Sequence, residues 1–206
     1  MYTYEQVKKA YSSKGYVFFG EKQFDLNIFG VRSPNRNQAI DSFDDKLGCA
    51  YIDLNGKPAV KIWKATTDPG LTHMQRPTFQ AAIERGTAIL CEGQYRAAYR
   101  VGYHGSGNWR HRALIQVGPV RIYRDKNRDT ILDVDGVPIT KGNFGINIHA
   151  ASLWRAEGKI GLYSAGCQVI QEPKDYFDLM DLCKRQESMG LGSSFTYTLF
   201  LESEIA

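Results

Sequence analysis

Short segments in which apolar and polar residues alternate constrain the fold of this chain more than any other feature. Phe24–Arg32 and Phe195–Leu201 alternate with a period of two, which predicts β-strands with one buried face. Turn signals separate such segments, as at Asn55-Gly56 and at Thr67-Asp-Pro-Gly70. No apolar run approaches the ~20 residues that a membrane-spanning helix needs. The pattern therefore predicts a mainly β fold that is not inserted into a membrane.

Two segments predict short helices instead. The first runs from Thr3 to Ser13 and opens with a capping box, in which the side chains of Thr3 and Gln6 can satisfy each other's backbone N–H groups. The second is expected at Pro173–Arg185, because proline suits the first helical position. The residues expected in its buried stripe are Phe177, Met180, Leu182 and Cys183.

The remaining elements complete a single expected domain. Further strands are predicted over residues 46–54, 59–66, 86–90, 95–103, 112–117, 120–123 and 145–149, and loops over 33–37 and 102–112. The 206 residues contain no repeat and no obvious linker, and this length is typical of one domain. We expect one domain over 1–206. Within it, residues 1–85 form an N-terminal β-rich part with the leading helix, and residues 86–206 carry the functional site.

The charge balance is mildly basic, with 26 Lys and Arg against 22 Asp and Glu. The chain has no Lys/Arg block of the kind that marks a nucleic-acid tail. Residues 95–103 interleave tyrosine with arginine, but their period of two favours one face of a strand over a base-stacking surface. The N-terminal residues lack the apolar segment of a secretory signal. We therefore expect synthesis in the cytoplasm and no nucleic-acid partner; the oligomeric state stays open.

The cysteine pattern argues against a metal ion, a disulfide scaffold or another cofactor. No C-x-x-C pair occurs among the four cysteines, which are Cys49, Cys91, Cys167 and Cys183. Residues 125–133 resemble the start of a calcium-binding loop. However, Thr130 stands where that loop needs glycine, and Gly136 where it needs a bidentate glutamate. We expect a solvated turn there, and no metal or cofactor in the protein.

The residues that suggest chemistry lie in the second half of the chain. His149 ends a predicted strand, and Ser164-Ala-Gly-Cys167 follows after fourteen residues. A thiol becomes a strong nucleophile when an imidazole helps to ionise it. Gly166 lets the backbone approach a substrate carbonyl, and N–H groups at Gly166 and Cys167 can stabilise an oxyanion. Ser164 is expected to hold the turn.

This pattern resembles the signature of the YkuD-type L,D-transpeptidases, in which a histidine precedes Ser/Thr-His-Gly-Cys by 14 to 17 residues. The matching positions are His149, Ser164, Gly166 and Cys167. The resemblance implies a single catalytic domain with a mixed-sheet β-sandwich, L,D-transpeptidase-like fold. Other segments are similar to small phage-borne proteins: 93–96, 147–149, 164–169 and 195–199.

The resemblance also implies a reaction. Cys167 would attack the carbonyl of an L-centred residue that precedes D-Ala in a peptidoglycan stem peptide, and D-Ala would leave behind a thioester. His149 would take the thiol proton and return it to the leaving amine. An amine acceptor would then give a cross-link, or water a trimmed peptide. Transfer and hydrolysis both stay open, and the protein would reach the cell wall after release or delivery.

The chain differs from the family pattern after the cysteine. Val169 stands where the family has an arginine, so another arginine is expected to bind the substrate carboxylate. The arginines considered for this role are Arg96, Arg100, Arg110 and Arg112. The substrate-binding residues that we predict are Arg96, Arg100, His104, Tyr163 and Gln168.

A rival hypothesis is a structural or binding module of a virion or secretion apparatus that retains a relic of the site. The reactivity of Cys167 separates the two. A thiolate beside an imidazolium should react with iodoacetamide near pH 6, whereas an ordinary thiol, with a pKa of ~8.5, should not.

Overall fold

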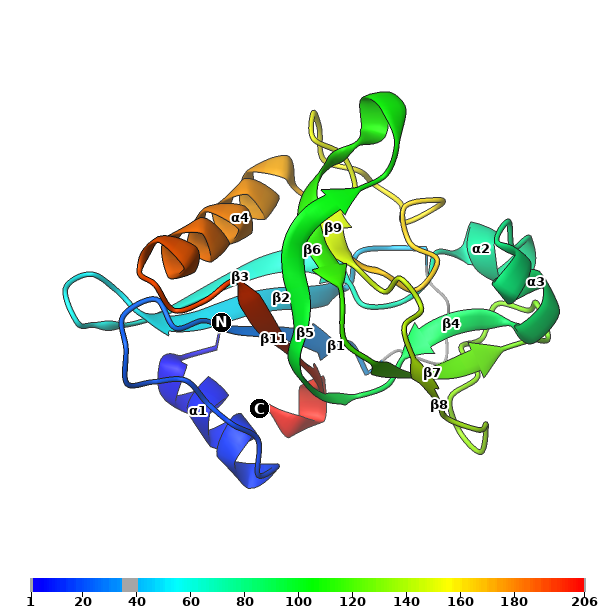
Figure 1. Cartoon of the computed structure of the whole chain (residues 1–206). Coiled ribbons are helices and arrows are strands. Elements are labelled where there is room, and N and C mark those ends of the chain that lie inside the picture. The colour runs from blue at the N-terminus through cyan, green and yellow to red at the C-terminus, as the bar shows by residue number, and fades with distance from the viewer. Residues whose placement is uncertain (1, 35–40, 206) are drawn as a thin grey trace.

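The computed structural model describes residues 2–34 and 41–205 and is mainly β, as the sequence predicts (Figure 1). The strands are β1 (Asn27–Arg32), β2 (Asp45–Ile52), β3 (Pro58–Thr66), β4 (Thr87–Leu90), β5 (Gly93–His104), β6 (His111–Gln116), β7 (Val120–Asp125), β8 (Thr140–Gly142), β9 (Ile148–Ala150), β10 (Gln168–Ile170) and β11 (Ser194–Leu201). The α-helices are α1 (Tyr4–Ser13), α2 (Leu71–Gln75), α3 (Gln80–Arg85) and α4 (Pro173–Ser188), with 3-10 turns η1 (Gly107–Trp109) and η2 (Glu202–Glu204). The loop expected at 33–37 lies partly outside the described residues.

Most strands form a closed barrel in the order β1-β11-β5-β6-β9-β10-β3-β2. A separate sheet, in the order β4-β7-β8, lies with α2 and α3 at one end of the barrel (Figure 1). This arrangement replaces the expected β-sandwich. The physical reason is that β1 pairs with both β2 and β11, and β3 pairs with both β2 and β10, so the large sheet closes on itself and leaves no free edge. The barrel draws strands from both 1–85 and 86–206.

The strand at β1 differs from its expected pattern. Alternation predicts one buried face, but all six residues of β1 are buried. One face points into the barrel. The other is covered by α1, whose Val7 and Tyr11 form an apolar cluster with Phe29 and Val31. Burial on both faces therefore follows from tertiary packing of the leading helix, which the alternation does not encode.

The two predicted helices form, and two shorter ones were missed. The Thr3–Gln6 capping box at the start of α1 is confirmed, and α4 begins at Pro173 as expected. The predicted stripe of α4 is partly wrong, because Phe177 is half exposed while Tyr176 is buried. The helices α2 and α3 have five and six residues, too few for an apolar period to show in the sequence. None of the described helices is long and apolar enough to cross a bilayer.

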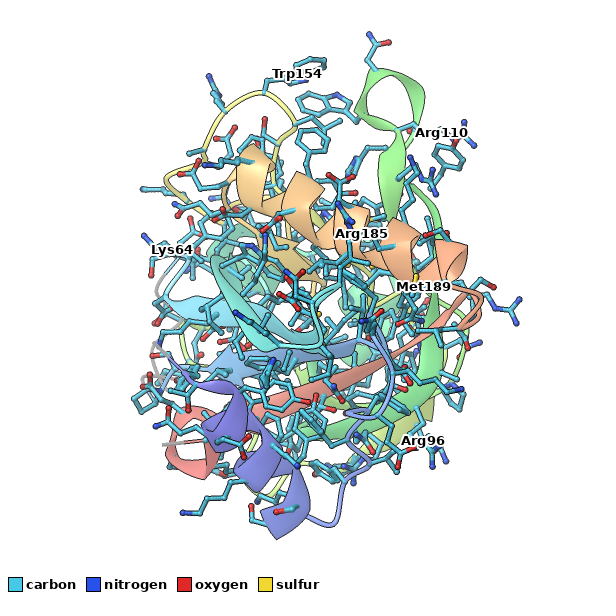
Figure 2. The ribbon with its side chains drawn as sticks, turned by 90° about the vertical axis from the view of Figure 1, so that its left-hand side faces the viewer. Lys64, Arg96, Arg110, Trp154, Arg185 and Met189 are labelled. Atoms are coloured by element: carbon cyan, nitrogen blue, oxygen red, sulfur yellow. The ribbon has the colours of Figure 1, made fainter. Side chains whose placement is uncertain are left out.

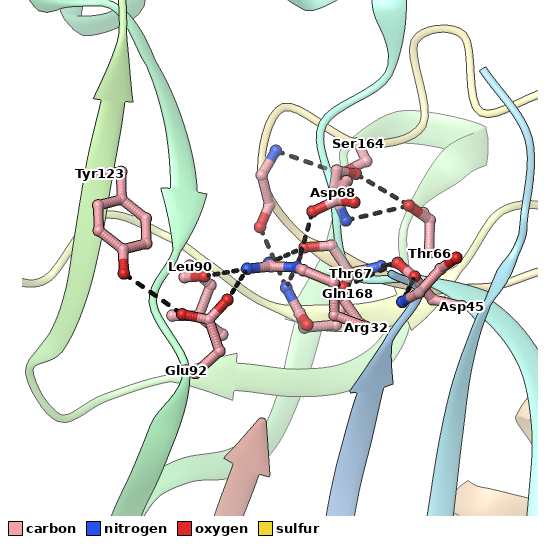
Figure 3. A network of polar contacts seen from close by, with 12 residues as sticks. Arg32, Asp45, Thr66, Thr67, Asp68, Leu90, Glu92, Tyr123, Ser164 and Gln168 are labelled. Atoms are coloured by element: carbon pink, nitrogen blue, oxygen red, sulfur yellow. Dashed lines mark hydrogen bonds and ion pairs between the residues drawn. The ribbon is translucent and has the colours of Figure 1, made fainter. Parts of the chain in front are cut away.

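A buried arginine joins the barrel to the neighbouring elements (Figure 3). Arg32, at the end of β1, has only 1% of its side chain exposed. Its guanidinium donates to Thr67 Oγ1 at 3.0 Å, to Thr67 O at 2.9 Å and to Leu90 O at 2.9 Å. It also lies 2.9 Å from Asp68 Oδ1 and 2.9 Å from Glu92 Oε1. One cation thus holds the turn after β3 and the connection from β4 to β5.

A third carboxylate, that of Asp45, extends this network toward the residues singled out in the sequence. Asp45 Oδ2 accepts from Thr67 N at 2.6 Å and from Thr67 Oγ1 at 2.8 Å. Thr67 O accepts from Gln168 Nε2 at 3.3 Å. Because Gln168 directly follows Cys167, the network fixes the backbone beside the candidate nucleophile.

Replacing the buried guanidinium should destabilise the fold strongly. In Arg32→Met the carboxylates of Asp45, Asp68 and Glu92 lose their shared cation, which should lower the free energy of unfolding by about 3 kcal/mol or more. Urea denaturation at pH 7 measures this change. The matched control is Arg155→Met, since Arg155 pairs with Glu157 but is 77% exposed, so solvent screens the pair and its loss should leave stability nearly unchanged. Equal losses in the two variants would contradict the central role of Arg32.

Candidate active site

The parallel pair β9–β10 brings the predicted cysteine and histidine onto one face of the barrel wall. His149 pairs in register with Val169, and Ile148 pairs with Gln168. Ile148 belongs to the barrel core, so His149 points to the outer side. Cys167 lies two residues before Val169 and packs with it in a separate apolar cluster. Since side chains two residues apart share a face, Cys167 and His149 lie on the same outer face.

The turn before Cys167 is held by the residues that the motif singles out. Ser164 Oγ donates to Cys167 O at 2.8 Å and accepts from Gly166 N at 3.2 Å. Gly166 has φ +118°, and a Cβ at this position would lie 2.4 Å from Ala88 O. Only glycine suits this conformation and this close approach. Ser164 therefore holds the turn as expected. The Gly166 N–H, however, is used within the turn and is not free for an oxyanion.

The Cys167 sulfur is a neutral thiol in this environment. Its Sγ accepts from Asn147 N at 3.4 Å and donates to Gly145 O at 3.4 Å, and the residue is 9% exposed. Burial raises the pKa of the thiol to about 11, against a smaller lowering by the Asn147 N–H. The expected thiolate is therefore wrong for the free protein at neutral pH, because the barrel wall excludes the water that would stabilise its charge.

The His149 imidazole is also neutral and has one nitrogen available as a base. Its Nδ1 lies 2.8 Å from Ala150 O, and because a carbonyl only accepts, Nδ1 carries the proton. Its Nε2 is buried and has no hydrogen-bond partner among the described residues, so it is not bonded to the Cys167 sulfur. Burial, then the neighbouring His104, lowers the pKa of His149 to about 3. The pair is thus a thiol and an unprotonated imidazole.

Two further histidines come from the end of the β5–β6 hairpin. His104 pairs with His111 across these strands, so the predicted loop at 102–112 is shorter than expected. The His104 ring stacks on His149 with centroids 3.9 Å apart, and its Nδ1 accepts from Asn147 Nδ2 at 3.1 Å. The His111 ring lies 5.9 Å from that of His149. This stacking helps to keep His149 buried and uncharged.

A cavity of about 490 Å³ lies beside the sulfur. Its lining includes Cys167 and His104, together with Arg85 and Arg124. Sequence reasoning missed both arginines. They belong to α3 and to β7, far along the chain from the Cys/His motif, and no local signal connects them to it. The residues completing the wall are Phe79, Ala81, Ala82, Ala88, Asn143, Phe144, Gly145, Ile146 and Ala165.

Of the five predicted substrate-binding residues, only His104 lines this cavity. Arg96 and Arg100 are exposed on β5, and Figure 2 shows Arg96 at the opposite end of the molecule from the hairpin tip. Gln168 is fully buried, because it follows Cys167 by one residue and so points into the barrel, where its Oε1 accepts from Tyr197 OH at 2.8 Å. Tyr163 packs, half-buried, on the cluster that contains Cys167.

The structure accounts for the apolar residue at position 169, where the resembled pattern has an arginine. Val169 is fully buried in an apolar cluster, where a guanidinium would lack a partner. The other two arginines considered as replacements, Arg110 and Arg112, do not line the cavity. Arg110 instead stacks on the Tyr103 ring at 3.9 Å.

No protein-family model, curated protein or solved structure matches the chain.

In the described residues, no group of three or more His, Cys, Asp and Glu side chains could hold a metal ion. The stacked histidines are therefore not arranged as a metal site.

The raised pKa of Cys167 predicts slow alkylation at neutral pH. The rate of carboxamidomethylation by iodoacetamide at Cys167 should rise about tenfold per pH unit from pH 7 to 10, because the thiolate fraction grows toward a pKa of about 11. Peptide mapping by mass spectrometry measures the rate, with N-acetylcysteine as the reference thiol. Half-maximal labelling near pH 6 would instead show an ion pair with His149.

The lowered pKa of His149 predicts acid sensitivity of the fold. Between the unfolded pKa of ~6.5 and the folded value of about 3, the unfolded chain binds a proton that the native chain does not. The free energy of unfolding should therefore fall as the pH falls through this window, by up to about 1.4 kcal/mol per pH unit from this residue. Urea denaturation from pH 7 to 4 should give a shallower slope for His149→Gln than for the wild type. Equal slopes would contradict the prediction.

Proposed function

We propose that this chain is a cysteine acyl-transfer enzyme that acts on peptidoglycan stem peptides at the bond between an L-centre and a D-centre. The observation that carries the proposal is the Cys167 sulfur, which lines a cavity and shares one face of the β9–β10 pair with the unprotonated His149. The spacing of His149, Ser164, Gly166 and Cys167, which resembles the YkuD-type pattern, supplies the substrate class. An L,D-transpeptidase-like fold is part of the same proposal.

The neutral pair favours general-base catalysis over a preformed ion pair. As Sγ of Cys167 attacks the carbonyl carbon, Nε2 of His149 takes the thiol proton, which requires the two side chains to come within hydrogen-bond reach. The Cys167 N–H has no backbone acceptor in the described part of the chain and can donate to the oxyanion. The C–N bond then breaks, the proton passes to the D-Ala amine, and a thioester remains.

The second half of the reaction restores the thiol. A water or an acceptor amine attacks the thioester carbonyl, His149 takes its proton, and the proton returns to sulfur as the C–S bond breaks. Water gives a trimmed stem peptide, and an amine gives a cross-link. We favour hydrolysis, as in a lytic or wall-trimming enzyme of a phage.

The alternative is a non-catalytic virion or secretion-system module with a relic of this site. Two observations favour it: the raised pKa of Cys167, and the lack of a hydrogen bond between Nε2 of His149 and the sulfur. A direct assay of catalysis separates the two proposals.

The wild-type protein should release D-Ala from purified muropeptides that end in a D-Ala residue, as followed by mass spectrometry. Cys167→Ala should abolish release, because it removes the sulfur that forms the proposed acyl intermediate. His149→Gln should lower the rate by about 10²–10⁴-fold. Cys91→Ala removes another buried cysteine and should act like the wild type. Equal release by the wild type and Cys167→Ala, or none by either, would leave the structural module as the better explanation.

A further inference from the structure

Two arginines from separate elements meet beside the Cys167 cavity. Arg85 ends α3 and Arg124 lies in β7, and both also line a second cavity of about 450 Å³ together with Lys126. None of the described residues around the first cavity is acidic. Neither arginine has a carboxylate within ion-pair distance among the described residues. The lining of the Cys167 cavity therefore carries two positive charges and no carboxylate, whereas Asp133 lies in the lining of the second cavity.

The fold holds Arg124 firmly beside the catalytic turn. Its Nη1 donates to Gly86 O at 2.9 Å, and its guanidinium lies 5.2 Å from the centroid of the Phe144 ring. In the β4–β7 register Arg124 is directly opposite Ala88. The carbonyl oxygen of Ala88 would lie only 2.4 Å from a Cβ placed on Gly166. The arginine strand and the turn that carries Cys167 are thus neighbours through a single intervening strand.

Holding two guanidiniums together costs free energy unless an anion lies between them. Burial, and next the charge of Arg85, lowers the pKa of Arg124, so the two cations repel each other. A carboxylate between them would relieve this repulsion and accept charge-assisted hydrogen bonds from both. Guanidiniums suit this role because their planar donor fork matches the two oxygens of a carboxylate.

We propose that Arg85 and Arg124 bind the terminal carboxylate of the residue that leaves, on the leaving-group side of Cys167. This inference rests on the proposed function and restricts its substrates to stem peptides with a free terminal carboxylate. A clamp on a free terminal carboxylate selects the last peptide bond of a stem peptide, and disfavours bonds whose D-residue continues into a cross-link. The arginine pair then takes the role of the family arginine that Val169 replaces, from a different part of the fold.

A binding experiment tests the clamp separately from catalysis. The Cys167→Ala protein is titrated calorimetrically with a synthetic stem tetrapeptide that ends in D-Ala, and with the same peptide as its C-terminal amide. We expect the free acid to bind at least about tenfold more tightly than the amide. This preference should vanish in Cys167→Ala combined with Arg85→Gln or with Arg124→Gln. Arg85 is exposed, so its variant should fold even if Arg124→Gln does not.

The matched control changes an arginine that lines neither cavity. Arg76→Gln removes an exposed arginine at the end of α2, outside both cavities, and should keep the preference for the acid. Equal binding of acid and amide, binding of neither, or a preference that survives Arg85→Gln would overturn the clamp. If the wild type releases D-Ala but the Cys167→Ala protein binds the acid and the amide equally, the arginine clamp is wrong and the proposed enzyme activity is retained. If the acid is preferred but the wild type releases no D-Ala, the carboxylate-binding role is retained and the proposed enzyme activity is wrong.

Discussion

The guanidinium of Arg32 is the interaction on which the rest of this structure depends. It sits where the barrel meets the three-stranded sheet, and it compensates carboxylates on three separate segments at once. The same hydrogen-bonded group reaches Thr67, and through Thr67 the side chain of Gln168. Polar contacts inside the protein therefore hold the backbone at Cys167. Apolar packing covers its outer side.

Burial decides how the candidate site can react. A charged sulfur or a charged imidazole would lose hydration that the barrel wall does not replace, so both Cys167 and His149 rest in their neutral forms. The Ala150 carbonyl keeps the imidazole in the tautomer that can accept a proton. A site of this kind has little intrinsic reactivity toward small electrophiles. A bound substrate would be needed to draw the thiol and the base into the same proton transfer.

The sequence predicts local features well and long-range pairing poorly. The capping box of α1 and the proline at the start of α4 are local, and both form as expected. The placement of His149 and Cys167 on one face of neighbouring segments agrees with the spacing that resembles a known motif. Closure of the barrel could not, because the β1–β11 pairing joins segments more than a hundred residues apart. Arg85 and Arg124 were missed for the same reason, since α3 and the β4–β7 pair bring them to the cavity beside Cys167 only in the folded chain.

The position of β11 in the barrel has a consequence for biosynthesis. This strand lies between β1 and β5, yet it follows every other barrel strand along the chain. The barrel therefore cannot close until β11 has been synthesised, after all the other barrel strands. Until then β1 and β5 each keep one unpaired edge, which only β11 covers in the described structure.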